Sequence, residues 1–97
     1  MRFDIAITAE AEEDLRGMGA RQRATVTSAI ELHLRHEPEK VSRSRIKRLQ
    51  NLDHPQYRLR VDVTRVFYDV VDRTVVVLAI VPKTEAAAWL DRSGKTK

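Results

Sequence analysis

The chain has 97 residues, with 18 Lys and Arg against 14 Asp and Glu, a net charge of +4 and no cysteine. This length suits one domain over residues 1–97. The lack of cysteine excludes a disulfide framework, a thiolate nucleophile and a cysteine-based zinc site. Early acidic residues argue against a secretory signal, and no stretch approaches the ~20 apolar residues of a membrane span. We therefore expect a cytoplasmic protein with no membrane partner.

The first third of the sequence predicts a strand followed by a helical hairpin. Apolar residues alternate with others over 3–7, which indicates a short strand, and Thr8 is suited to cap the acidic helix that follows. Gly17 and Gly19 interrupt the helical pattern. A second helix is predicted over 20–35, because its apolar residues recur at four-residue spacing.

The rest of the sequence predicts a polar connector, three strands and a short final helix. The connector EPEKVSRSRIKRLQNLDHPQ precedes strands at 57–63, 65–71 and 74–81, which are separated by short turns and should pair as an antiparallel meander. Pro82 ends the pairing, the segment EAAAWL forms the helix, and the tail over 91–97 is expected to be flexible. Together these elements define an α+β fold.

Positive charge is concentrated in the middle of the chain. Residues 40–65 hold eight basic and two acidic side chains, so the local charge is 8 − 2 = +6 and the remainder is slightly acidic. Such a segregated field favours a polyanion, of which nucleic acid is the commonest. Ordinary solvation of the connector is the alternative.

The strands gather some of these cations on one face of the predicted sheet. Successive side chains of a strand point to opposite faces, so Arg58 and Arg60 share a face that the apolar residues of 57–63 avoid. Arg65 opens the next strand, and Lys83 follows the third. Because the planar guanidinium group fits phosphate oxygens, this pattern favours a phosphate ligand over simple exposure.

The order of elements, together with the segments YRLR, TRVFYDV, VVVL and RIKRL, resembles the RelE/ParE superfamily of toxins from type II toxin-antitoxin systems. The RelE branch cuts messenger RNA in the ribosomal A site, whereas the ParE branch inhibits DNA gyrase. The compact helical hairpin is more similar to the RelE branch. The resemblance thus implies a ribosome-dependent mRNA endonuclease that inhibits translation. A ParE-like gyrase inhibitor and a weakened RelE relative that acts as a co-regulator with its antitoxin are the alternatives.

The family pattern carries over to four cations of this sequence. Its two strand cations match Arg58 and Arg60, its next arginine matches Arg65, and its basic residue after the last strand matches Lys83. An arginine and a tyrosine of the pattern are missing, since Thr84 and Leu90 occupy those positions. Slower cleavage, a base from elsewhere such as His54, and binding without cutting would each account for this.

Metal-free RNA cleavage uses the 2′-hydroxyl as nucleophile, so the protein must activate it, stabilise a phosphorane and protonate the leaving oxygen. Arg58, Arg60 and Arg65 are suited to the phosphorane because guanidinium stays protonated. Lys83 is the candidate base, because nearby like charges disfavour its protonated form. No cofactor is expected. His33 and His36 lack a third ligand, so no metal is expected either.

The resemblance also implies partners. We expect a cognate antitoxin, the ribosome and mRNA, and operator DNA for the toxin-antitoxin complex. Trp89 either stacks on a base or, more simply, pins the last helix. Four connector cations are predicted to grip RNA phosphates around the site: Arg43, Arg45, Lys47 and Arg48.

Overall fold

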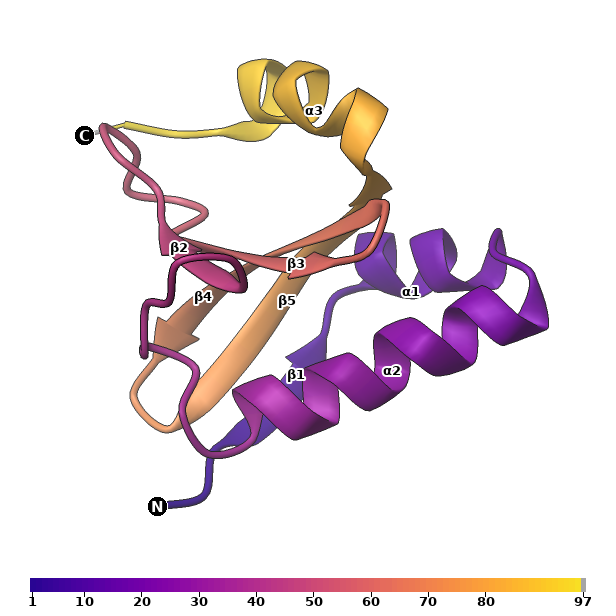
Figure 1. The fold of residues 1–97 in the computed structure, drawn as a ribbon. Coiled ribbons are helices and arrows are strands. Elements are labelled where there is room, and N and C mark those ends of the chain that lie inside the picture. The colour runs from indigo at the N-terminus through magenta and orange to yellow at the C-terminus, as the bar shows by residue number, and fades with distance from the viewer. Residues whose placement is uncertain (97) are drawn as a thin grey trace.

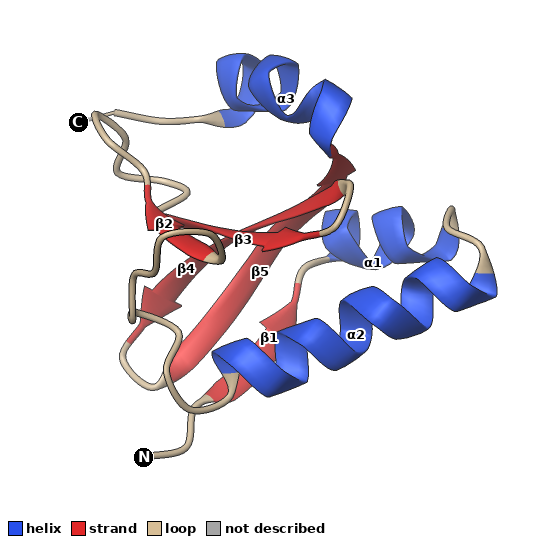
Figure 2. Ribbon diagram, viewed as in Figure 1, coloured by secondary structure: helices blue, strands red, loops and turns tan. Residues whose placement is uncertain are grey.

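A computed structural model describes residues 1–96 of the chain as a five-stranded sheet in the order β1-β5-β4-β3-β2, with helices on both faces (Figures 1 and 2). The elements are β1 (Asp4–Ile7), α1 (Ala9–Arg16), α2 (Ala20–Leu34), β2 (Ile46–Arg48), β3 (Tyr57–Val61), β4 (Thr64–Val71), β5 (Thr74–Pro82) and α3 (Ala86–Ser93), the last preceded by a 3₁₀ turn (Lys83–Glu85). In residues 1–96, no helix is both long and apolar enough to cross a membrane.

The predicted α+β class is confirmed, and so are the helical hairpin and the antiparallel β3-β4-β5 meander. The predicted order of elements was incomplete, because the connector contains a fourth antiparallel strand, β2, at the edge of the sheet. This strand has only three residues, IKR, of which only Ile46 is apolar, so it is too short for alternation to reveal it. At the opposite edge β1 runs parallel to β5.

Two tight turns set the register of the meander. Asp62 and Asp72 begin the two-residue turns after β3 and β4, with φ values of 51° and 56°. Aspartate tolerates this left-handed conformation better than most residues, because its short side chain bonds the nearby backbone. Both turns lie where the sequence predicts them.

One face of the sheet packs on α1 and α2. Alternate residues of β3, β4 and β5 form an apolar cluster there with the stripe of α2 and with Ala11 of α1. Thr8 caps α1 as predicted, since its Oγ1 accepts a hydrogen bond from the Ala11 N–H at 3.2 Å. The buried Tyr68 ring stacks on Tyr57, and its hydroxyl donates to the Pro38 carbonyl at 2.6 Å. We call this side the helix face.

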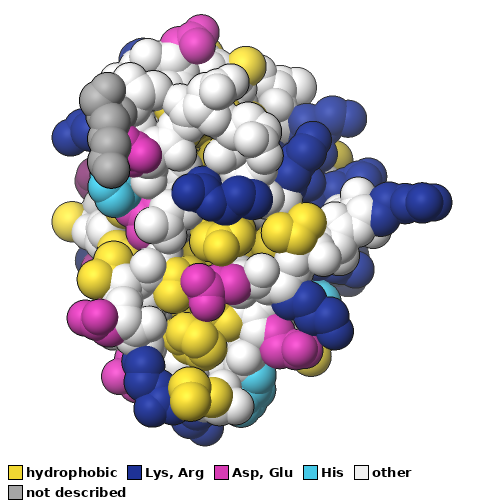
Figure 3. Space-filling view, turned by 90° about the vertical axis from the view of Figure 1, so that its left-hand side faces the viewer, with side chains coloured by type: hydrophobic (Ala, Val, Ile, Leu, Met, Phe, Trp, Pro, Cys, Tyr) yellow, Lys and Arg dark blue, Asp and Glu magenta, His cyan; other side chains and the backbone are white. Residues whose placement is uncertain are grey.

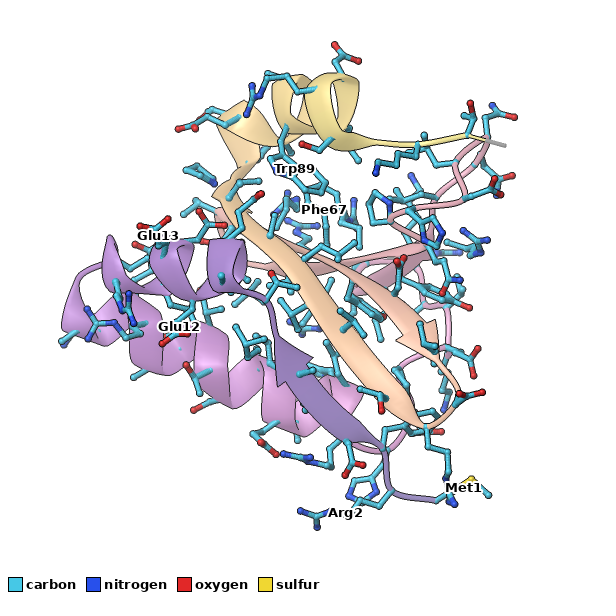
Figure 4. The ribbon with its side chains drawn as sticks, turned by 180° about the vertical axis from the view of Figure 1, so that it is seen from behind. Met1, Arg2, Glu12, Glu13, Phe67 and Trp89 are labelled. Carbon is cyan, nitrogen blue, oxygen red and sulfur yellow. The ribbon has the colours of Figure 1, made fainter. Side chains whose placement is uncertain are left out.

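The opposite side, which we call the α3 face, carries a smaller apolar cluster. Trp89 of α3 stacks on Phe67 of β4 with ring centroids 4.9 Å apart, and Figure 4 shows the two side by side between helix and sheet. The Trp89 indole N–H donates to Glu10 of α1 at 2.8 Å. Trp89 is buried, which confirms that it pins the last helix; it is not exposed for stacking on a base.

The C-terminal segment lies against the loop before β3. Helix α3 extends to Ser93, and Lys95 exchanges backbone hydrogen bonds with His54 of that loop. The tail over 91–97 was predicted to be flexible. Flexibility of 91–96 stays a prediction, although these contacts hold part of the segment in place, and residue 97 lies outside the described residues.

Candidate functional site

The pairing of the strands brings the predicted cations together on the α3 face. Arg58 pairs with Phe67 on one side and with Lys47 on the other, and Arg60 pairs with Arg65. Phe67 belongs to the apolar cluster of the α3 face, so the alternation of the strands places these cations on the α3 face as well. We call Arg58, Arg60 and Arg65 the arginine cluster. The predicted gathering of these three residues is thus present.

Arg65 also has a structural role within the cluster. Its side chain is buried, and its Nη1 donates to the carbonyls of Asp62 at 2.8 Å and Thr64 at 3.0 Å. These bonds hold the turn between β3 and β4 and fix the guanidinium. A substitution of Arg65 therefore changes the turn as well as the charge.

Arg58 is half-buried and incompletely bonded. Its Nε is buried without a hydrogen-bond partner, the single such side-chain atom found among the described residues. A buried, unpaired donor costs about 1–3 kcal/mol, because water no longer solvates it. A ligand with an acceptor oxygen would remove that penalty.

The electrostatics of the cluster favour an anion. Burial lowers the pKa of Arg58, and the neighbouring Arg65 and Arg60 lower it further. Burial also lowers the pKa of Arg65, followed by the charge of Arg60. Within the described part of the chain, no carboxylate forms an ion pair with these three residues. The cluster remains charged and lacks an internal counter-ion.

Lys83 lies at the same end of the sheet as Arg60 and Arg65. Its backbone N–H donates to the carbonyl of Val63, in the turn between β3 and β4, at 2.7 Å. Its side chain is exposed. The structure thus places Lys83 beside the turn that Arg65 holds.

The four connector cations do not form one group. Arg43 precedes β2, and Arg45 and Lys47 lie along the sheet edge, where the Arg60 N–H donates to the Arg45 carbonyl at 2.9 Å. The guanidinium of Arg48 lies 5.4 Å from the centre of the Tyr57 ring, and its Nη1 donates to backbone carbonyls of Leu49 and Gln56. In Figure 3, Lys and Arg side chains gather toward one side of the surface, whereas its middle carries apolar and acidic groups.

His54 has a partner that sequence reasoning missed. Its Nδ1 lies 2.7 Å from Oδ2 of the buried Asp69, whose Oδ1 accepts the Gln56 N–H at 2.8 Å. Asp69 lies four residues beyond Arg65 on β4, which corresponds to about 13 Å along the strand. His54 thus stands at the far end of the α3 face from Arg60 and Arg65. The alternation of β4, which puts Asp69 on the same face as Phe67, was the available signal.

The structure was compared with known proteins. No protein-family model matches the sequence, and no curated protein matches it significantly. Solved structures do match. The RelBE2 toxin-antitoxin complex from Mycobacterium tuberculosis is 25% identical with a TM-score of 0.71, over 84% of this chain and 99% of that chain.

Two further structures agree in fold. The archaeal RelE-RelB complex from Pyrococcus horikoshii OT3 is 20% identical with a TM-score of 0.69, over 86% of this chain and 97% of that chain. The isolated Escherichia coli RelE toxin is 15% identical with a TM-score of 0.61, over 91% of this chain and 98% of that chain. The fold is therefore that of a toxin from a toxin-antitoxin system. More specifically it is RelE-like, which confirms the resemblance inferred from the sequence.

Proposed function

We propose that this protein is the toxin of a type II toxin-antitoxin system and acts as a ribosome-dependent, metal-independent mRNA endonuclease. The observation that carries the proposal is the arginine cluster, which is partly buried, has no carboxylate partner within residues 1–96 and includes the unpaired Nε of Arg58. Such a site is suited to a phosphate group, since phosphate oxygens accept several guanidinium hydrogen bonds.

In the proposed reaction, the 2′-hydroxyl of the messenger attacks the adjacent phosphorus and the bond to the 5′-oxygen breaks. A cyclic 2′,3′-phosphate forms, the general base takes the proton of the 2′-hydroxyl, and the leaving 5′-oxygen takes a proton from water. Arg58, Arg60 and Arg65 would bind the non-bridging oxygens, whose negative charge grows in the phosphorane. Lys83 is the candidate base, because the structure holds it at the same end of the sheet as Arg60 and Arg65.

The proposed partners follow from the same surface. The RelBE2 structure and the archaeal RelE-RelB structure are both toxin-antitoxin complexes, which supports a cognate antitoxin for this chain. An antitoxin with acidic residues would neutralise the arginine cluster and compete with RNA. We further propose that the ribosome presents the messenger to this face, and that the toxin-antitoxin complex binds operator DNA.

The test is messenger cleavage in a purified translation system, with and without ribosomes. Arg60→Ala is preferable to a change at Arg65, because Arg60 is exposed and Arg65 holds a turn. Loss of one group that stabilises transition-state charge typically costs about 100- to 1,000-fold in rate. Arg16→Ala is the matched control, since Arg16 is an exposed arginine on α1 with a surface partner, Glu12.

Cleavage that requires ribosomes, persists in Arg16→Ala and is lost in Arg60→Ala would support the proposal. Intact messenger with unimpaired translation would overturn it. A DNA-damage response on expression would then indicate gyrase inhibition. Operator binding together with an antitoxin, without toxicity, would indicate a co-regulator that has lost its chemistry, in line with Thr84 and Leu90 at positions of the missing arginine and tyrosine.

A further inference from the structure

A second hollow, with several basic residues in its lining, lies at the end of the sheet that is farther from Arg60 and Arg65. Its volume is about 470 Å³, and its lining includes Arg48, His54 and Lys95, with Asp53 as the carboxylate among the described lining residues. Of these basic residues, only Arg48 was a predicted RNA contact. Its lining comes from the loop before β3 and from the C-terminal segment, two segments that lie next to each other in Figure 1.

The imidazole of His54 is held in one orientation. Asp69 binds its Nδ1 from the buried side, at 2.7 Å, and Asp69 is itself held by the Gln56 N–H. The Nε2 is the ring nitrogen left for a ligand, and 54% of the side chain is exposed. In its protonated form an imidazole donates from both ring nitrogens, so the Nε2–H on the open side can bond to an oxygen of an anion while Nδ1 stays on Asp69.

Backbone hydrogen bonds hold Lys95 beside this imidazole. The Lys95 carbonyl accepts from the N–H groups of Asp53 at 2.8 Å and His54 at 3.2 Å, and the Lys95 N–H donates to the His54 carbonyl at 2.7 Å. The Lys95 side chain is exposed. Its ammonium group is therefore available to an anion in the same hollow.

Arg48 completes the set. Its Nη1 is occupied by the carbonyls of Leu49 and Gln56, which fixes the position of the guanidinium against the end of the loop. The guanidinium also lies over the Tyr57 ring, so its plane is supported on one side. A fixed guanidinium loses little entropy when it binds a phosphate oxygen.

We propose that His54, Lys95 and Arg48 form a second phosphate-binding subsite, which holds a backbone phosphate of the RNA strand whose scissile phosphate lies on the arginine cluster. This proposal rests on the proposed function for the identity of the strand. Gln56 lies four residues before Arg60 on the chain, so the two sites are separated by about 13 Å along the strand. Lys47, exposed on the sheet edge beside Arg58, lies between them.

The experiment measures binding of a short single-stranded RNA with 2′-O-methyl groups, which lacks the nucleophile and so reports binding without cleavage. Lys95→Ala removes one cation and keeps the backbone bonds of Lys95. At 0.1 M salt we expect affinity to fall about 5-fold, because a single-strand phosphate contact contributes about 0.7 to the salt slope. Arg92→Ala, a change at an exposed cation of α3, is the matched control and should bind as the wild type does.

His54→Gln, monitored for folding, tests the second member of the subsite and should also weaken binding. In NMR spectra of the wild type, the imidazole resonances of His54 should shift when the RNA is added. Those of His36, which lies just after α2, should not shift. An oligonucleotide series should show a step in affinity once the strand is long enough to reach both sites. Unchanged affinity in Lys95→Ala and His54→Gln, with a static His54 resonance, would overturn the subsite.

Inorganic phosphate is the second probe. A shift of His54 with phosphate but not with RNA would overturn an RNA strand as the source of the ligand. The nuclease proposal can fail separately. If the wild-type protein binds the RNA through His54 and Lys95 but cuts no messenger, the subsite is supported and the nuclease proposal is wrong. If cleavage depends on Arg60 but substitutions of Lys95 and His54 leave the RNA affinity unchanged, the nuclease proposal is supported and the subsite is wrong.

Discussion

The helix face and the α3 face are formed by the same strands, but the environments of their side chains differ. On the helix face, buried apolar residues from four strands, β2 to β5, pack against α1 and α2 in one cluster. On the α3 face, apolar packing is restricted to the region of Phe67 and Trp89, and the arginine cluster occupies positions beside it. Because most of the apolar core lies on the helix face, the other face can hold cations that reduce stability and serve binding.

The largest predicted effect is on the helix face. Leu59 is fully buried in the main cluster, and Leu59→Ala should destabilise the protein by about 2–5 kcal/mol through lost transfer energy and a residual cavity. Urea unfolding followed by circular dichroism measures this change. A loss below about 1 kcal/mol would mean that the helix face is not the main source of stability.

A substitution in the arginine cluster should change stability in the opposite direction. Arg58→Met replaces a half-buried cation with an unpaired Nε by an apolar chain of similar length, so stability should rise by about 1 kcal/mol. Messenger cleavage should fall in the same variant. A destabilised Arg58→Met would show that the cation is compensated within the free protein, and the contrast between the faces would not hold. Arg16→Met, at an exposed position, is the matched control for the general effect of the substitution.

Trp89→Phe sharpens the comparison within the α3 face. Phenylalanine retains an aromatic ring against Phe67 but cannot donate to Glu10, so we expect a loss of about 1 kcal/mol. Chemical unfolding of this variant and of Glu10→Ala, which removes the acceptor but keeps the Trp89 ring, separates the hydrogen bond from packing. Equal stability of Trp89→Phe and the wild type would show that the Glu10 bond contributes nothing to the attachment of α3.

The smallest predicted effect concerns Asp14 on the helix side. Burial raises its pKa above the ordinary value of 3.8, with nearby acidic residues adding to the rise, while the Ile80 N–H acts in the opposite direction. The folded protein therefore holds this proton more tightly than the unfolded chain. The contribution of this tighter proton binding to the stability of the fold is complete below pH 3.8, and it is lost as the pH rises through the higher pKa of the folded protein.

Asp14→Asn keeps an acceptor for Ile80 and removes the titration. The stability of the wild type relative to this variant should therefore fall slightly as the pH rises from below 3.8. Urea unfolding at a series of pH values measures the difference. A relative stability that rises over the same range would mean that the Ile80 bond, rather than burial, dominates the environment of Asp14.

Most of the fold follows from local sequence patterns. The alternation in β3 and β4, the Thr8 cap and the turn aspartates each encode structure within a few residues, and these features lie close to where they were predicted, although β3 ends at Val61 rather than at residue 63. Strand β2 did not follow from the sequence, because its existence depends on pairing with β3 rather than on its own three residues. The parallel partner of β1 likewise depends on contacts between the two ends of the chain.

The candidate site divides in the same way. Alternation and register put Arg58, Arg60 and Arg65 together, as the sequence predicts. The bonds of Arg65 to its own turn and the support of His54 by Asp69 were not predictable, because both depend on side-chain conformations in the folded state. The catalytic and RNA-binding roles of these residues stay predictions.

The pairing of β1 with β5 has a consequence for the order in which the domain assembles. The hydrogen bonds that the Thr8 hydroxyl donates to Val77 and Leu78 of β5 join residues 69 and 70 positions apart, whereas β3 and β4 are joined by a two-residue turn. Local pairings form early and distant ones late, because closing a long loop costs more chain entropy. We therefore expect the arginine-bearing hairpin to form first in a nascent chain, with the edge strand β1 docking only after β5 has emerged. The main apolar cluster on the helix face would therefore be completed late in synthesis.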